Sequence, residues 1–206
     1  PIAIGGRNTR ALNAGERDDF DGRMRALRVT RWCRYFGDYS VPALPLPKEP
    51  PTEGDTYYGS VVSLLHFDGS DGSTNIRDRK GKVWTVSGAA QLDTAQAKSG
   101  NSSLSLSGSP ATDRVSSPSH VDFGFGLGDF TIEAWVRITT LAPTFQIIYD
   151  GRNLGTSQAR PTVYIHLGVL KFYTLGADRI TGIAMTGNVA LGVAEELRDR
   201  VRLGVP

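Results

Sequence analysis

Short runs of alternating apolar and polar residues constrain the fold of this chain more than any other feature. The clearest run is FTIEAWVRIT at residues 130–139. Apolar and polar side chains alternate along it at period two, which is typical of a strand with one buried face. One face would carry Phe130, Ile132, Ala134 and Val136, and the other would carry Thr131, Glu133, Trp135 and Arg137.

Further runs predict a chain built of many short strands. Similar patterns occur at residues 61–67, 82–86, 103–106, 145–149, 162–167 and 169–173. The chain also has 24 glycines, many of them beside Ser, Thr, Asn or Asp, which is the composition of tight turns. This spacing of strands and turns predicts an all-β fold, an antiparallel β-sandwich.

Two stretches are ambiguous. Val193, Leu197 and Val201 have helical spacing, so propensity alone indicates a helix over residues 193–203. Leu27 and Val29 fit a strand, although the same run fits a turn of helix. Propensity is a weak guide that tertiary context often overrides, so both alternatives stay open.

Charge and apolar content narrow the classes of partner. The 23 basic and 21 acidic residues leave a formal charge of +2, too little to predict nucleic-acid binding. No run is long or apolar enough to predict a membrane span, and the first residues lack the pattern of a signal peptide. The start at a proline indicates a fragment or a processed product. We therefore expect neither nucleic acid nor a membrane as a partner.

The densest basic run and the single cysteine have simple structural explanations. The run comprises Arg23, Arg25, Arg28, Arg31 and Arg34. Such a stripe could meet phosphates or acidic sugars, but a solvated face is the preferred interpretation. Cys33 is the only cysteine, which excludes an intrachain disulfide and a multi-cysteine metal site and is typical of a buried thiol.

Several motifs together resemble a known family. They are VVSLLHFDGSDGST from residue 61, AQAKSGNSSLSL from residue 95, GDFTIEAWVR from residue 128 and YIHLGVLKFYTLGADRITG from residue 164. In this order they resemble the laminin G-like, concanavalin A-like jelly-roll domains common in bacteriophage tail and fibre proteins. The resemblance covers residues 61–182 well and 189–205 more loosely.

The first residues resemble the end of the same domain. IAIGGRN at residues 2–8 is similar to a late strand of the family, and residues 20–47 are similar to its last strand and proline-rich exit. The resemblance implies parts of two tandem jelly-roll domains: residues 1–47 as the C-terminal part of one, 48–59 as a proline-rich linker, and 60–206 as the N-terminal and central part of the next. A circular permutation is the alternative, in which both pieces would share one core.

The run YDGRN supplies the candidate carbohydrate-binding residues. Tyr149, Asp150, Arg152 and Asn153 combine an aromatic ring with planar groups that can fork onto sugar hydroxyls. The alternative is an ordinary hairpin turn in which Asp150 bonds its own backbone.

Acidic residues give only weak signs of a metal. Asp68 and Asp71 lie in a glycine-rich loop that could present oxygens to calcium, but Asx turns explain both. Relatives often bind structural calcium through an acidic pair in the last strand, where this chain has Arg25 and Ala26. Nearby acids that could substitute are Asp18, Asp19 and Asp21. We therefore expect no required cofactor and assign no metal ligand, with structural calcium left open.

Catalytic motifs are not found in the sequence. A retaining glycosidase needs two carboxyl groups about 5 Å apart, yet Glu133 has no acid in register on its strand. His66, His120 and His166 show neither triad nor metal-ligand spacing. GFGLGD at residues 124–129 precedes a strand, whereas a dinucleotide loop precedes a helix. We predict that the protein is not an enzyme.

The resemblance implies a function. It is that of a non-catalytic, lectin-like binding module on a phage tail, fibre or capsid surface. Its partners would be host cell-surface polysaccharide and other virion proteins, and we expect a homo-oligomer. The alternatives are a purely structural virion spacer or decoration protein and a glycanase.

Overall fold

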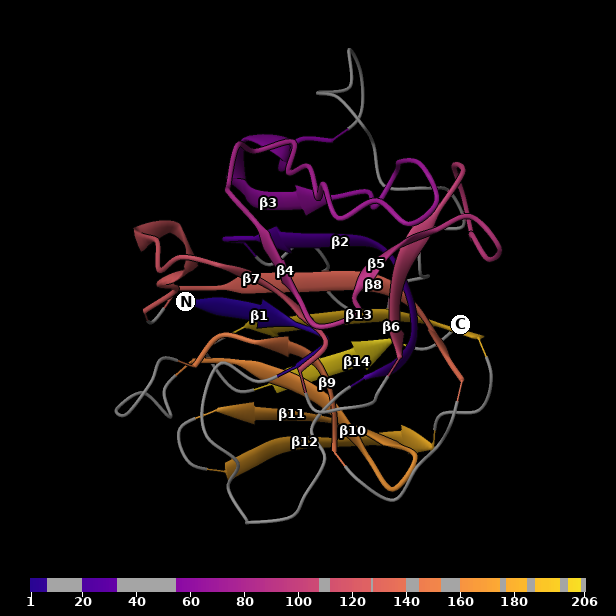
Figure 1. Cartoon of the computed structure of the whole chain (residues 1–206). Coiled ribbons are helices and arrows are strands. Elements are labelled where there is room, and N and C mark those ends of the chain that lie inside the picture. The colour runs from indigo at the N-terminus through magenta and orange to yellow at the C-terminus, as the bar shows by residue number, and fades with distance from the viewer. Residues whose placement is uncertain are drawn as a thin grey trace.

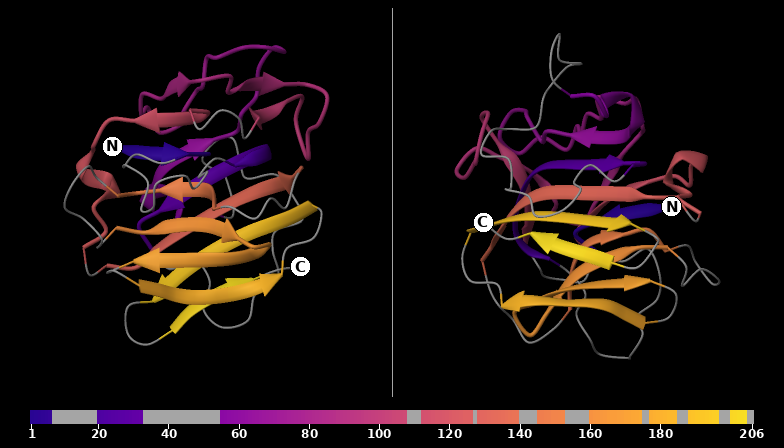
Figure 2. Two further views of the ribbon diagram at one scale, coloured as in Figure 1. Left: turned by 60° about the horizontal axis from the view of Figure 1, so that its bottom comes forward. Right: turned by 180° about the vertical axis from the view of Figure 1, so that it is seen from behind.

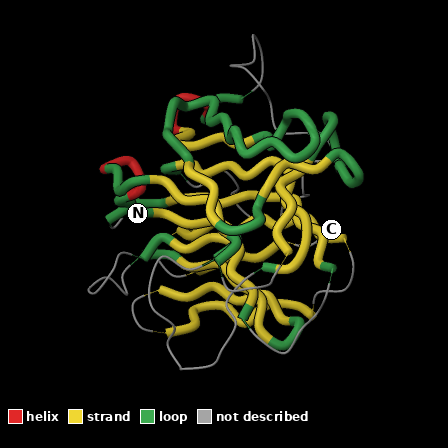
Figure 3. The backbone as a smooth tube through the Cα atoms, viewed as in Figure 1, coloured by secondary structure: helices red, strands yellow, loops and turns green. Residues whose placement is uncertain are grey.

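The computed structural model describes residues 1–6, 20–32, 55–107, 112–126, 128–139, 145–152, 160–174, 177–184, 188–196 and 200–204. These residues form strands joined by turns and two single-turn 3-10 helices, Tyr58–Ser60 and Val121–Phe123, with no α-helix among them (Figures 1 and 3). None of the described residues forms a helix long and apolar enough to cross a membrane.

The strands belong to two antiparallel sheets. The first sheet has the order β12-β11-β10-β9-β1-β7-β4. Its strands are β12 (Ala177–Ala184), β11 (Val169–Thr174), β10 (Thr162–His166), β9 (Gln146–Asp150), β1 (Ile2–Ile4), β7 (Arg114–Ser117) and β4 (Thr85–Ser87). The N-terminal strand β1 therefore lies inside this sheet, between β9 and β7.

The second sheet is organised around the long strand β2. Its order is β14-β13-β8-β2-β6-β5, and β3 also pairs with β2. The strands are β14 (Arg200–Gly204), β13 (Asn188–Glu196), β8 (Phe130–Ile138), β2 (Asp21–Thr30), β6 (Ser103–Ser107), β5 (Gln91–Asp93) and β3 (Val61–Leu65). The first half of β2 pairs with β6 and the second half with β3, so these two short strands share one edge of β2.

The two sheets pack face to face and enclose one main core (Figure 2). The predicted inward residues of β8 all lie in this core. They are Phe130, Ile132, Ala134 and Val136. The predicted fold class, an all-β antiparallel sandwich, is confirmed.

Strands from both sides of the proline-rich segment share this core. Ile2 and Ile4 of β1 and Met24 of β2 pack in the same cluster as Phe130 and Phe172. This is the arrangement that the permutation alternative predicts. The division into two jelly-roll domains at residues 47 and 60 itself stays a prediction.

Residues 193–203 are not helical where the structure describes them. β13 and β14 pair as antiparallel strands, with Val193 opposite Leu203, and β13 also pairs with β8, where Val193 lies opposite Ile132. The helix indicated by spacing is therefore wrong here, because hydrogen bonding along both edges of β13 outweighs a modest helix propensity. The strand alternative for Leu27 and Val29 is confirmed, since both belong to β2.

A bulge in β2 turns its arginines away from the core. The register with β8 shifts between Arg25 and Arg28, and Ala26 has a positive φ of 52°. Met24 and Leu27 can therefore both face the main core, while Ala26 joins a small separate cluster with Val61 and Leu64.

Two arginines of the stripe do not lie on the solvated face that we expected, whereas Arg31 is exposed and Arg34 lies outside the described residues. Arg25 and Arg28 are only 3% and 4% exposed. Arg25 donates to Asp68 at 2.5 Å and to the carbonyl oxygen of Ser102 at 2.6 Å. Acidic and carbonyl oxygens from distant segments thus compensate the buried charge, which would otherwise be costly.

Candidate functional site

The predicted sugar-binding residues lie at the buried end of β9. Tyr149 and Asp150 have no exposed surface, and Arg152 is 8% exposed. Burial raises the pKa of Tyr149 above its usual range, and its ring packs in the main core. Asn153 lies outside the described residues. The ring of Tyr149 therefore presents no face on which a sugar could stack.

The Asp150 carboxylate is occupied by internal donors. It accepts hydrogen bonds from the backbone N–H of Arg152 at 3.0 Å, from Arg152 Nε at 2.8 Å and from Thr162 Oγ1 at 3.2 Å. The first bond is the Asx bond of Asp150 to its own backbone that the alternative interpretation predicted, while the rest of that turn lies outside the described residues. Arg152 also lies 5.9 Å from the centre of the Tyr173 ring. The described part of YDGRN is thus a buried ion pair.

The acidic residues considered for calcium do not converge. Asp68 is paired with Arg25, and Asp71 accepts from the backbone N–H of Thr94 at 3.0 Å. In the described ranges no three His, Cys, Asp or Glu side chains gather as metal ligands would. Asp18 and Asp19 lie outside these ranges.

Residues considered for catalysis lie on separate elements. His120 caps the second 3-10 helix by accepting from Asp122 N–H at 3.2 Å, and His166 stacks on Phe145 with ring centres 4.2 Å apart. His66 is buried after β3. Glu133 accepts from Arg28 Nε at 2.6 Å. The structure does not bring these residues together.

A different surface combines an exposed aromatic ring with cations. Trp32 is 46% exposed and stacks on Tyr57, with ring centres 6.1 Å apart and an angle of 20° between the planes. The two rings meet because Thr30 pairs with Val61 and Arg31 N–H donates to the Ser60 carbonyl at 3.0 Å. The β2–β3 pairing therefore brings together residues on either side of the proline-rich segment.

A cleft of about 470 Å³ adjoins these residues, and we call it the basic cleft. Its lining includes Arg31, Ser60, Val61, Lys80, Lys82 and Asp122. The exposed Arg31 forms no ion pair with another described residue. Lys80 Nζ lies 4.6 Å from the centre of the Tyr58 ring and donates to the Tyr58 carbonyl at 3.4 Å.

Asp122 compensates only part of this positive charge. Its carboxylate is 2.7 Å from Lys82 Nζ, and this hydrogen bond lowers the pKa of Asp122 below its usual value, so the group stays ionised at neutral pH. Three cations face one carboxylate in the basic cleft. An anionic or strongly polar ligand is therefore favoured there.

Asp78 fixes the loop that carries the lysines. Its carboxylate accepts from Ser63 Oγ at 2.7 Å, Leu64 N–H at 3.0 Å, Lys80 N–H at 2.7 Å and Trp84 Nε1 at 3.0 Å. These bonds attach residues 78–84 to the outer edge of β3. In the run RDRK, Asp78 is the single acid among three basic residues. Its carboxylate therefore anchors a loop whose other charged side chains are positive.

We expect Asp78→Ala to lower the free energy of unfolding by about 2–4 kcal/mol, because four donors lose their shared acceptor. Urea unfolding followed by circular dichroism would measure the loss. Asp71→Ala is the matched control, since among the described residues Asp71 bonds only Thr94, in an exposed turn. Equal effects of the two substitutions would contradict this role of Asp78.

The sequence interpretation missed this surface. The relevant signals are RW at residues 31–32, TYY at residues 56–58 and RDRKGK at residues 77–82. Their proximity depends on the register of β2 and β3, which no local pattern specifies. Comparison with family models, curated proteins and solved structures finds no match to this chain.

Proposed function

We propose that the protein is a non-catalytic, lectin-like binding module that contacts host-surface glycan through Trp32 and the basic cleft. The observation that carries this proposal is the exposed Trp32 ring, stacked on Tyr57 at the end of β2. An aromatic face can cover the apolar C–H side of a sugar ring, while hydroxyl, ammonium and carboxylate groups bond its hydroxyls. Ser60, Lys80 and Asp122 supply those groups.

The distribution of exposed apolar side chains supports this surface. Four large apolar residues are markedly exposed in the described part of the chain. Three of them lie at or next in sequence to the residues of this region: Trp32 follows Arg31, Val83 follows Lys82 and Val121 precedes Asp122. Exposed apolar groups gathered beside polar ones are typical of a binding surface. The fourth, Leu167, lies in the β10–β11 turn.

The location that we propose, a phage virion appendage at the particle surface, rests on the motif resemblance. Partners would be host polysaccharide and other virion proteins. A single shallow site of this kind binds weakly. A homo-oligomer or tandem array would therefore gain affinity by presenting several copies at once.

We propose a non-enzymatic function because the acids near β8 form ion pairs with a buried arginine. Glu133 and Asp55 both bond the buried Arg28 guanidinium, at 2.6 and 3.3 Å. Their side chains are 7% and 8% exposed. A glycosidase pair must instead face a cleft that admits the sugar and a water molecule.

We expect Trp32→Ala to weaken glycan binding about two- to tenfold, because loss of an aromatic contact costs about 0.5–1.5 kcal/mol. Titration calorimetry with polysaccharide extracted from candidate host cell surfaces would measure it, with a parallel assay for new reducing ends. Leu167→Ala, another exposed apolar residue, should leave the affinity unchanged.

Three results would contradict the proposed function. Saturable binding that is unchanged in the Trp32→Ala variant would show that Trp32 is not part of the binding site. New reducing ends that require the folded protein would show a glycanase. If no polysaccharide binds and the chain instead captures a virion protein through Trp32 and Val121, the structural alternative is correct.

A further inference from the structure

A second cleft, of about 370 Å³, is lined by other residues of the loop that carries the lysines. Arg77 and Arg79 line it, together with the polar side chains of Ser70, Ser73 and Asn75. Lys80 and Lys82, from the same six-residue run, line the basic cleft. The run RDRKGK therefore presents cations to two clefts at once. We call the second one the arginine cleft.

The acids near these clefts are engaged within the protein. The two Asp78 oxygens accept from four donors, as described above. Asp68, which also lines the arginine cleft, is bonded to the buried Arg25 guanidinium. In contrast, the exposed Arg77 and Arg79 form no ion pair with other described residues. The donors to Asp78 are neutral, so its carboxylate offsets one of the nearby charges, and the two arginines still leave the arginine cleft with an excess of positive charge.

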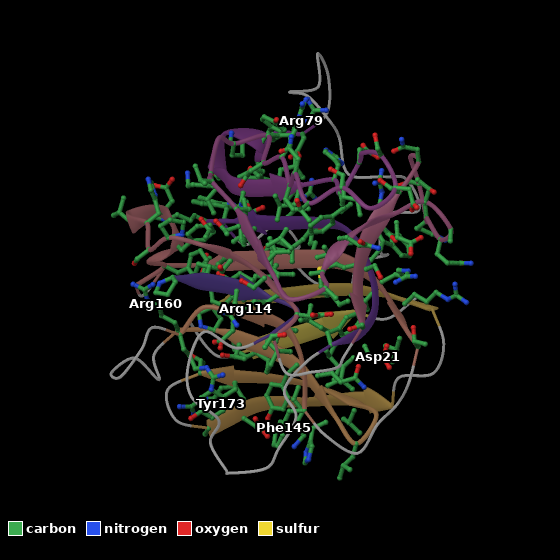
Figure 4. All side chains as sticks on the ribbon, in the orientation of Figure 1. Asp21, Arg79, Arg114, Phe145, Arg160 and Tyr173 are labelled. Carbon is green, nitrogen blue, oxygen red and sulfur yellow. The ribbon has the colours of Figure 1, made fainter. Side chains whose placement is uncertain are left out.

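This charge lies at one end of the molecule. Figure 4 shows Arg79 beside β3, far from Tyr173 and Phe145, which lie toward the opposite end. The whole chain carries only +2, so the local excess reflects placement rather than a generally basic protein. Guanidinium groups bind carboxylate and phosphate with paired hydrogen bonds, so such a surface selects anions.

We propose that the basic cleft and the arginine cleft together bind one anionic polysaccharide, whose sugars carry carboxylate or phosphate groups. This inference rests on the proposed function and specifies its ligand. Ser70, Ser73 and Asn75 offer hydroxyl and amide groups for the sugar hydroxyls, and the arginines take the charges. Two clefts lined by different residues of the loop require a polymer and not a single sugar.

The test compares matched polymers. Polygalacturonate supplies carboxylates, a phosphomannan supplies phosphates on sugars, and carboxyl-reduced polygalacturonate is the neutral counterpart of the first. We expect the protein to bind at least one anionic polymer at least tenfold more tightly than the neutral one. Raising the salt concentration should weaken that binding, because part of the affinity comes from released counterions.

Charge-removing variants locate the binding. Arg31→Ser acts on the basic cleft, and the double variant Arg77→Ser with Arg79→Ser acts on the arginine cleft. Each should weaken binding of the anionic polymer about tenfold and reduce its salt dependence. All three side chains are exposed, so the variants should fold, which thermal unfolding checks. Arg137→Ser is the control, because Arg137 is exposed near the other end of β8.

Each outcome has a distinct meaning. Equal binding of the neutral and anionic polymers, weakened by Trp32→Ala, would overturn this inference and leave the proposed function standing. Binding lost in Arg31→Ser but not in the Arg77 and Arg79 double variant would overturn the joint use of two clefts. Tighter binding of a single-stranded oligonucleotide would overturn the polysaccharide assignment. Failure to bind any polymer or host polysaccharide would overturn the inference and the proposed function together.

Discussion

Replacing Arg152 by alanine is expected to lower the free energy of unfolding by about 3–5 kcal/mol, because it removes the arginine that forms a buried ion pair with the Asp150 carboxylate. Asp150 has no exposed surface, and two Arg152 nitrogens bond its side chain, Nε at 2.8 Å and Nη2 at 3.1 Å. Urea unfolding at neutral pH would measure the change. The folded fraction of the variant should bind glycan as the unmodified chain does.

The double variant Asp150→Asn with Arg152→Ala distinguishes the loss of the ion pair from the cost of leaving one charge buried. Its loss of stability should be smaller than that of Arg152→Ala, because the buried carboxylate charge is also removed. The opposite pattern for Arg152→Ala, with stability unchanged and glycan binding lost, would show that Arg152 contacts sugar. It would restore the surface role predicted from YDGRN.

Glu133→Ala is expected to have an effect of similar size, about 3–5 kcal/mol, because it removes the carboxylate that lies closest to the buried Arg28 guanidinium, at 2.6 Å against 3.3 Å for Asp55. Arg28 joins β2, β8 and the segment before β3, so all three should lose protection together. Urea unfolding gives the total loss, and amide hydrogen exchange shows where protection falls.

Arg137→Ala on the same strand is the control for Glu133→Ala. Arg137 is exposed, so its removal should change stability by less than about 0.5 kcal/mol. A Glu133→Ala variant as stable as the Arg137→Ala variant would contradict the buried network. It would also reopen the question of what Glu133 does on its strand.

Local patterns predicted the strands but not the partners of the charged residues. The alternation in FTIEAWVRI is a property of nine consecutive residues, so β8 and its buried face could be predicted. The burial and the ion-pair partners of the β2 arginines could not be predicted in this way. Arg25 bonds Asp68, 43 positions away, and Arg28 bonds Glu133, 105 positions away. Only the sheet order brings these charges together.

The same distinction applies to the two candidate sites. The Asx turn at Asp150 is local, and the sequence offered it as the alternative. The burial of Asp150, in contrast, depends on the neighbouring strand β1. In that pairing Ile4 lies opposite Tyr149, although 145 positions (149 − 4) separate them. Trp32 and Tyr57 likewise meet across a proline-rich segment. Their surface is visible only once β2 and β3 are paired in register.

The most direct test of the proposed binding surface is a nuclear magnetic resonance titration of the isotope-labelled chain with the polysaccharide that binds it. We predict shifts at the Trp32 indole N–H and at the amides of Arg31, Arg77 and Arg79, with Arg152 and Tyr173 unchanged. Shifts at Arg152 and Tyr173, with Trp32 and Arg79 silent, would place the site at the opposite end of the molecule and contradict the account.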